Sequence, residues 1–370
     1  MKPSSALSFL FIALLTSGPA HAWFRVGCTG PLVSERVDPI ISPNSNPSNH
    51  VHTIHGASNF RANSTFDVLR ASKCTSCLVA QDLSNYWFPK LYFQDPKTKL
   101  FEPVSNGGLL VYYQNRGDGE KKNGGPGLKA FPPGFKMLSG NPRARSKKYP
   151  YLEGSQGELR ERAAEWACLR YPGSAGYNGF GFPTTDCEAG FSARLHMPAC
   201  WDGINVDSAD HISHTAYLSR LDNGACPSTH PVPLLKLFYE ITWDVTPFAS
   251  RWKPSQDRWP FVYATGDPTG YSFHGDFQNG WDINVLQNAI DRCDNPNDQT
   301  GNGKSTMTMH SITEACSYLT VLNASAGNAC KIASVVNEPV DGSLSRLPGC
   351  NPLQIGPGDA TLYSSPNCPM

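Results

Sequence analysis

The sequence predicts a mainly β protein: a β-sandwich or jelly-roll-like domain with a few helices, long loops and a disulfide-tied C-terminal extension. The 370-residue chain contains 33 glycines and 31 prolines, residues that interrupt helix interiors. Aromatic residues make up 11% of the chain, which supplies ample apolar material for a packed core. This composition favours an ordered fold of strands and loops.

Three segments have the residue pattern of strands. Residues 109–114 are β-branched and aromatic, residues 235–245 alternate roughly between apolar and polar side chains, and residues 261–265 form a short run that ends at a glycine. Gly, Pro or Asn bounds each segment, as is typical of strands in a sandwich. Two further segments predict helices: residues 157–169, which are rich in Glu, Arg and Ala, and residues 283–292, whose apolar side chains share one face.

The N-terminus has the features of a secretory signal. A short apolar run, residues 7–15, precedes Ala20-His21-Ala22, which has the small-x-small form that signal peptidase recognises. We expect cleavage after Ala22. The predicted organisation is therefore a signal peptide (1–22), a main β-rich domain (23–293) and a disulfide-rich extension (294–370) packed on that domain.

A different cleavage site would change the chemistry. Cleavage after Ala20 would leave His21 as the first residue, and an N-terminal histidine with a second histidine is how copper monooxygenases of polysaccharides bind their metal. Pro19 beside that bond and the better Ala-His-Ala site disfavour this alternative.

The 12 cysteines behind a signal peptide predict disulfides and a secreted protein, either extracellular or associated with the cell wall. Cys74 and Cys77 have the spacing of a redox motif, but no βαβ pattern surrounds them, so we interpret them as structural half-cystines. Asn63 and Asn323 begin glycosylation sequons, which predict a glycoprotein.

The overall charge argues against two classes of partner. The formal net charge is +0 and the sequence pI is about 7.1. Such a chain creates no long-range field that would attract a nucleic acid or an anionic membrane. No segment after the signal is long and apolar enough for a membrane helix. We expect a monomer that binds neither a nucleic acid nor a membrane.

The first candidate cluster contains His50, His52 and His55. On a strand, His50 and His52 point to the same side. Two neutral imidazoles on one face can bind a divalent metal, or one can act as a base while the other orients substrate. The alternative is that these histidines bond to backbone groups in a loop.

The second cluster lies between residues 194 and 214. It combines Asp202 for proton transfer, Trp201 for stacking on a sugar ring, and Arg194, His211 and His214 for hydroxyl or uronate groups. A calcium site is an alternative, because four side chains supply hard oxygens: Asp202, Asn205, Asp207 and Asp210.

The third cluster follows the strand predicted at residues 261–265. His274 and Asp276 are two residues apart, so an extended backbone presents them together. Asp267 and Asp282 are better explained as caps, Asp282 at the start of the predicted helix.

Taken in order, these motifs resemble a secreted fungal family known only as domain of unknown function number nineteen ninety-six. The resemblance spans residues 23–293. It rests above all on His50-Val51-His52-Thr53-Ile54-His55-Gly56, Cys74-Thr75-Ser76-Cys77, Cys200-Trp201-Asp202-Gly203 and Gly280-Trp281-Asp282. The resemblance implies a protein secreted by a filamentous fungus, without a defined activity. His196 departs from the pattern before the Cys200 motif and is therefore a weaker candidate than His211 or His274.

We therefore expect an enzyme that cleaves extracellular or cell-wall polysaccharide, by hydrolysis or by elimination. The predicted catalytic residues are His52, Asp202, His211, His274 and Asp276. The predicted substrate-binding residues are His50, Asp82, Trp87, Tyr113, Arg194, Trp201, His214 and Trp281. The one cofactor that these residues indicate is a divalent metal at the His/Asp cluster, and the metal itself is left open.

The rival hypothesis is a non-catalytic wall-associated or glycan-binding protein, which would use aromatic rings without an acid–base pair. Structure separates the two hypotheses. Convergence of the predicted His and Asp side chains in one cleft would favour the enzyme, and scatter over separate loops would count against it.

Overall fold

The computed structural model describes residues 22–45, 47–172, 176–254, 256–293, 316, 318–364 and 367–369. The predicted signal sequence up to His21, including the alternative cleavage site, lies outside the described residues. Within the described ranges, no helix has both the length and the apolar character needed to cross a membrane.

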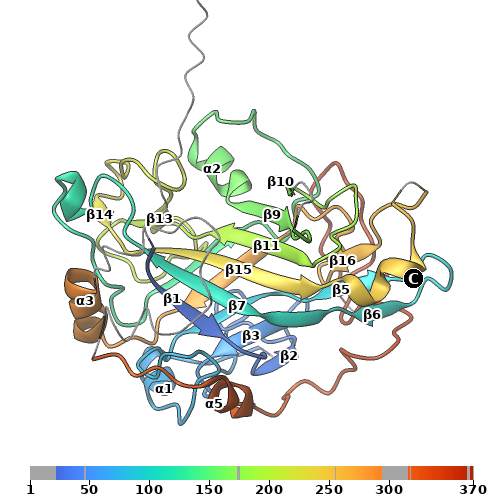
Figure 1. The fold of residues 1–370 in the computed structure, drawn as a ribbon, viewed down its shortest axis with the longest axis horizontal. Helices are drawn as coiled ribbons and strands as arrows, with labels where there is room; N and C mark the ends of the chain where they lie inside the picture. Colours follow the sequence, from blue (N-terminus) through green and yellow to red (C-terminus); the bar gives the residue numbers. More distant parts are fainter. Residues whose placement is uncertain are drawn as a thin grey trace, which may run out of the picture.

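Two antiparallel sheets form the body of the molecule (Figure 1). The six-stranded sheet has the order β1 (Ala22–Cys28), β7 (Ser105–Gln114), β15 (Lys236–Asp244), β11 (Phe191–His196), β9 (Ala164–Cys168) and β10 (Tyr177–Gly179). The five-stranded sheet has the order β2 (Val33–Glu35), β3 (His52–Gly56), β4 (Asn85–Pro89), β17 (His274–Gln278) and β8 (Lys136–Gly140). The mainly β fold predicted from the sequence is confirmed.

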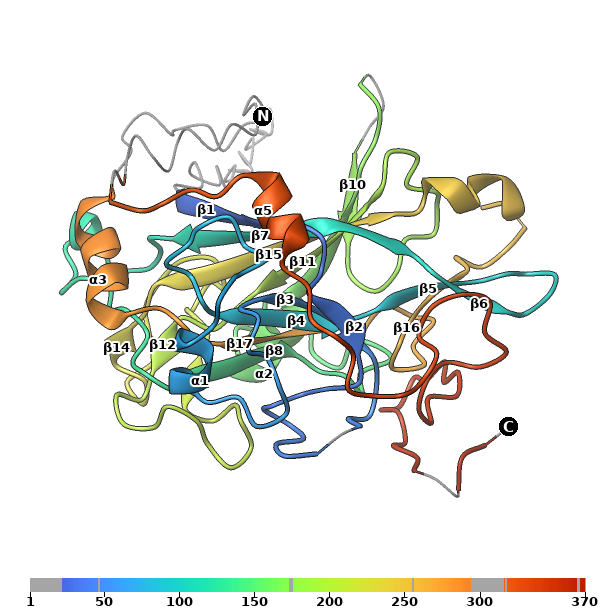
Figure 2. The same ribbon diagram turned by 90° about the horizontal axis from the view of Figure 1, so that it is seen from below.

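The main core lies between these two sheets, which Figure 2 shows as adjacent layers. Tyr86 and Phe88 of β4 pack against Tyr239 and Trp243 of β15, with ring centroids 5.8 and 5.9 Å apart. All four side chains are fully buried. Burial of each aromatic side chain stabilises the fold by about 1.5–3 kcal/mol, so these rings dominate the contact between the layers.

Smaller elements surround the two layers. Two three-stranded sheets have the orders β16 (Phe261–Tyr263), β5 (Leu91–Gln94), β6 (Phe101–Pro103) and β13 (Thr215–Ala216), β12 (Cys200–Trp201), β14 (Val232–Pro233). Within the described ranges, the α-helices are α1 (Phe66–Arg70), α2 (Gln156–Arg162), α3 (Ile283–Arg292) and α5 (Ala324–Ala329), and the short 3-10 helices are η1 (Lys121–Asn123) and η2 (Thr246–Arg251).

The predicted helix at residues 157–169 is partly wrong. Helix α2 ends at Arg162, and the following residues form strand β9. Trp166 and Cys168 are buried there, and β9 pairs with both β10 and β11, so sheet pairing overrides the helical propensity of the segment. The second predicted helix is confirmed as α3, and Asp282 caps it by accepting two backbone N–H bonds.

All 12 cysteines are paired. The disulfides are Cys28–Cys77, Cys74–Cys330, Cys168–Cys187, Cys200–Cys226, Cys293–Cys316 and Cys350–Cys368. The structural interpretation of Cys74 and Cys77 is therefore correct, because each is bonded to a distant partner.

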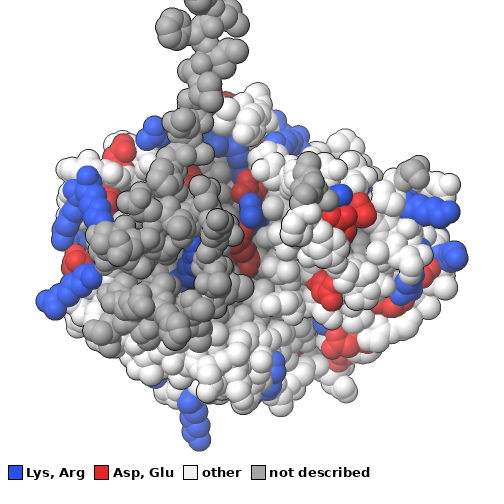
Figure 3. Space-filling view, viewed as in Figure 1, with Lys and Arg blue, Asp and Glu red and all other residues white. Residues whose placement is uncertain are grey.

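The described C-terminal residues run along the main body and contact it repeatedly (Figure 2). Backbone bridges join Val79 to Val321 and Phe101 to Leu344. On the face in Figure 3, positive and negative side chains are interspersed, and much of the visible surface is uncharged.

His55 gives the fold a measurable pH dependence. It is buried on the core side of β3 and stacks on Phe88, with ring centroids 5.7 Å apart. Burial lowers the pKa of His55 to about 3, against an ordinary value of 6.5. Below pH 6.5 the unfolded chain therefore binds more protons, so the free energy of unfolding must fall as the pH decreases.

We expect His55→Gln to reduce the loss of stability between pH 7 and pH 5 by about 2 kcal/mol, because one buried neutral imidazole is removed. Urea denaturation of both proteins at the two pH values measures the difference. An unchanged pH dependence in the variant would show that His55 is not held neutral.

Candidate functional site

The five-stranded sheet brings two histidines together across one proline. His52 pairs with Pro89 in the β3–β4 register, and Asp276 pairs with Trp87 in the β17–β4 register. Continuing the second register by two residues places His274 on the other side of Pro89. Because side chains alternate along a strand, Asp276 shares the face of His274.

His50 joins this pair from the loop before β3. Its Nε2 atom lies 3.0 Å from the Nε2 atom of His274, and its ring centroid lies 4.2 Å from that of His52. All three imidazoles are buried, and one ring nitrogen from each lies within 4.8 Å of the others. His50 and His52 lie on one side of the chain, as the alternation indicates.

Two backbone carbonyls fix the orientation of the rings. The Nδ1 atom of His52 lies 3.2 Å from the carbonyl oxygen of Val37, and that of His274 lies 2.8 Å from the carbonyl oxygen of Ser272. A carbonyl only accepts, so each Nδ1–H is the donor and each Nε2 carries a lone pair. The Nε2 atom of His52 is buried and has no hydrogen-bond partner among the described residues.

Burial keeps these imidazoles neutral. Desolvation lowers the pKa of His52 and His274 to about 3, and it lowers the pKa of His50 well below the ordinary value. Desolvation has the opposite effect on a carboxyl group and raises the pKa of Asp276 well above its usual range. The Oδ2 atom of Asp276 is buried without a hydrogen-bond partner among the described residues.

These four side chains line a cavity of about 260 Å³. Asp38 lies in the same wall, where its Oδ1 atom accepts the backbone N–H groups of residues 40 and 41 at 2.9 and 3.1 Å. Arg160 of α2 also lines the cavity, and its Nε atom donates to the carbonyl oxygen of Gly140 at 2.8 Å. The far wall comes from the C-terminal segment, and its members include Cys350, Asn351, Gln354 and residues 360–363.

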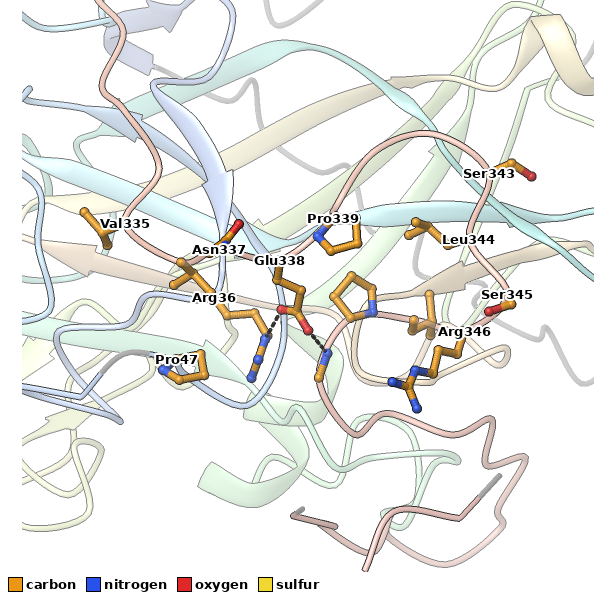
Figure 4. A pocket seen from close by; sticks show the side chains of 14 residues that line it. Arg36, Pro47, Val335, Asn337, Glu338, Pro339, Ser343, Leu344, Ser345 and Arg346 are labelled. Carbon is orange, nitrogen blue, oxygen red and sulfur yellow. Dashed lines mark hydrogen bonds and ion pairs between the residues drawn. The ribbon is translucent and has the colours of Figure 1, made fainter. Parts of the chain in front are cut away.

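A second cavity lies beside the loop that carries His50. It measures about 630 Å³ and lies between Arg36 and residues 335–349 (Figure 4). Glu338 accepts from Arg36 at 2.5 Å and from the backbone N–H of Gly349 at 2.8 Å, and Arg36 donates to the carbonyl oxygen of Ser48 at 2.6 Å. This cavity contains none of the predicted site residues, so the histidine cavity is the better candidate.

The second sequence cluster does not join the cavity. Asp202 forms a tight turn, in which its Oδ1 atom accepts the backbone N–H groups of residues 204 and 205 at 2.8 and 2.9 Å. The Nδ1 atom of His211 bonds to Asp207 at 2.7 Å. His214 is buried, and both of its ring nitrogens are bonded inside the fold, one to a serine hydroxyl and one to a backbone carbonyl.

The other two members of that cluster also lie apart from the histidines. Trp201 is half-buried, and its indole N–H donates to the carbonyl oxygen of Asn205 at 2.6 Å. Arg194 of β11 forms an ion pair with Glu240 of β15 at 2.8 Å. Neither lines the histidine cavity, so the structure separates them from His52 and His274.

Four predicted substrate-binding residues belong to the core. Asp82, Trp87, Tyr113 and Trp281 are fully buried. Both tyrosine hydroxyls of the Tyr86–Tyr113 pair bond to Asp82, and the indole N–H of Trp281 donates to Tyr113 at 2.8 Å. Rings enclosed in this way cannot stack on a bound sugar, which corrects their assignment as substrate-binding residues.

Sequence reasoning missed part of the cavity. Asp38 occurs in the chain beside Pro39, without a pattern that assigns it a role. Arg160 lies in a segment recognised only as helical. The C-terminal wall carries polar and small residues without periodicity, so no local signal could place it over the histidines.

The chain belongs to the family described as a domain of unknown function (DUF1996), whose sequence profile matches residues 38–281. The matched range contains all three histidines of the cavity and Asp276, whereas the C-terminal wall lies beyond it. No curated protein and no solved structure matches the chain significantly. The family is thus established, and its description names no activity.

Gly140 is a sensitive position beside the site. It lies opposite His274 in the β8–β17 register, has a φ of +83°, and an added Cβ would lie 2.4 Å from the carbonyl oxygen of Phe273 and 2.9 Å from the Cβ of His274. Gly154 has a φ of +84° with nothing within 4 Å, so it provides a matched control.

We expect Gly154→Ala to lower the free energy of unfolding by about 1 kcal/mol, the cost of a left-handed backbone. Gly140→Ala should cost about 2–4 kcal/mol, because overpacking adds to that strain. Denaturant titration measures both values. If both variants lost the same free energy of unfolding, the strand beside His274 would have to shift without cost to accommodate the added methyl group.

Proposed function

We propose that this chain is a secreted enzyme that cleaves glycosidic bonds in extracellular or cell-wall polysaccharide, with its reaction centre in the histidine cavity. One observation carries the proposal: His50, His52, His274 and Asp276 converge in a single cavity, where two of their polar atoms have no hydrogen-bond partner in the part of the chain that the structure describes. Unpaired buried polar groups destabilise a fold, so such a cluster favours a functional explanation.

The residues of the cavity include both a proton acceptor and a proton donor. A neutral imidazole accepts a proton, and the carboxyl group of Asp276 donates one to the leaving oxygen. Arg160 supplies positive charge for a hydroxyl or a uronate carboxylate. In hydrolysis by two carboxyl groups, Asp38 would be the second, although two backbone amides already occupy its Oδ1 atom. Elimination would use a histidine as the base.

The size of the cavity limits how much substrate can enter. At about 260 Å³ it falls just below the ~300–1,000 Å³ of typical small-ligand sites. We therefore expect it to admit one sugar residue, such as a chain end, rather than a long stretch of polymer.

Three features support the secreted part of the proposal. Six disulfides without a free cysteine are typical of proteins from oxidising compartments. Asn63 and Asn323, which begin the two sequons, are both exposed and accessible to a glycan. The mixed, largely uncharged surface in Figure 3 suits a neutral polymer better than a nucleic acid.

The test is mass spectrometry of the products after incubation of the mature protein with a panel of fungal and plant polysaccharides. Saturated oligosaccharides indicate hydrolysis, and unsaturated ends indicate elimination. We expect Asp276→Asn to lower turnover by about 10²–10⁴-fold, the usual contribution of a positioned acid or base. Asp67→Asn, at an exposed position on α1, should keep the activity of the parent.

Full activity in Asp276→Asn would show that the reaction centre does not lie in this cavity. If the parent releases no product yet is retained by one of the polysaccharides, the glycan-binding hypothesis replaces the enzyme.

A further inference from the structure

We propose that the Nε2 atoms of His50, His52 and His274 form a binding site for one divalent transition-metal ion of the zinc class. The inference concerns binding of the ion alone, and it does not depend on polysaccharide cleavage. An ion held by the Nε2 lone pairs would leave neither His52 nor His274 free to act as the base in elimination. The inference rests on the positions of the three rings, on their backbone anchors and on the chemistry of the donor atoms.

The spacing of the nitrogens fits a metal ion. Two ligands on a tetrahedral zinc ion, each about 2.0–2.1 Å from the metal, lie about 3.3 Å apart. The Nε2 atoms of His50 and His274 are 3.0 Å apart, and the candidate nitrogens of all three rings lie within 4.8 Å of one another. The pair formed by His50 and His274 is thus close to the spacing of two zinc ligands, and the third ring must approach to complete the site.

The hydrogen bonds at Nδ1 are those expected of metal-binding histidines. Such a histidine usually donates the N–H of its other ring nitrogen to a carbonyl or a carboxylate. His52 and His274 do so to the carbonyl oxygens of Val37 and Ser272. The Nε2 lone pairs of His52 and His274 consequently point into the cluster. His50 therefore donates its Nε2–H to His274 in the ion-free protein, and metal binding requires that proton to leave or to move to Nδ1. The Nε2 atom of His52 is fully buried without a partner among the described residues, and a metal ion would satisfy it.

Two carboxyl groups line the cavity beside the histidines. These are Asp38 and Asp276. Burial raises the pKa of both, so each offsets the charge of a dication only by releasing its proton when the ion binds. Two arginines whose charges act on His50 are engaged in ion pairs: Arg36 with Glu338 at 2.5 Å, and Arg145 with the buried Asp267 at 3.7 Å. Arg160 lines the same cavity, where its positive charge partly cancels the negative charge of any ionised carboxylate.

The donor set selects the class of ion. Three imidazoles suit Zn²⁺, Cu²⁺ or Ni²⁺, whereas Ca²⁺ and Mg²⁺ require oxygen ligands. Three protein ligands also leave a position for water or substrate, as in catalytic zinc sites. All three histidines line the cavity, so a small ligand bound there would lie near the ion.

The test uses mature protein treated with EDTA, dialysed and titrated with ZnCl₂, with bound zinc measured by mass spectrometry of the metal and affinity measured by calorimetry. We expect one zinc per chain and a raised Tm in the parent. His52→Gln should bind at least 100-fold more weakly, since removal of one of three ligands breaks the site. His55→Gln is the matched control, because His55 is equally buried on the same strand but faces the core.

Visible absorption of the Co²⁺-loaded parent provides a second readout that does not depend on activity, because tetrahedral coordination gives strong bands. The inference is overturned if the folded parent binds no zinc at 100 µM, or if His52→Gln binds zinc as tightly as His55→Gln does. Circular dichroism of each variant establishes that a loss of binding is not a loss of folding.

Discussion

The alternation of side chains in the five-stranded sheet is the constraint on which the rest of the molecule depends. One face of β3, β4 and β17 carries His55, Tyr86, Phe88 and Phe277, which are buried toward the six-stranded sheet or its edge. The opposite face carries His52, His274 and Asp276. Because the period of a strand is two residues, a register slip of one residue would exchange the two faces. The apolar core therefore holds the polar cluster in place.

The C-terminal segment completes the cavity that the five-stranded sheet lines with histidines. Cys74–Cys330 ties it to the main body across 256 residues of sequence, and backbone bridges continue the attachment at Val321 and Leu344. Glu338 then holds Arg36, which in turn bonds to the loop that carries His50. The segment thus acts on the histidines in two ways, as a wall of the cavity and as a support for one of its members.

Local patterns in the sequence predicted the parts of this structure that depend on local physics. Alternation placed His50 with His52 and His274 with Asp276, and a capping aspartate marked the start of α3. The meeting of the two pairs could not be predicted, because it depends on how β3 and β17 each pair with β4.

The same limit explains why other candidates lie apart from the cavity or pair differently. Asp202 and His214 have the composition of a reactive cluster, yet their polar atoms are used in turns and in backbone contacts that the sequence does not reveal. Trp87 and Trp281 resemble sugar-stacking residues until tertiary packing encloses them. Residues 164–168 have helical composition but pair between two strands.

The position of the cavity wall late in the chain has a consequence for biogenesis. Translation delivers the chain from its N-terminus, so both histidine-bearing strands leave the ribosome before residues 350–363 exist. The imidazoles can therefore assemble while their pocket is still open on one side. An ion or a small molecule present while the chain folds would meet the site at that stage, and the arrival of the last segment would then enclose it.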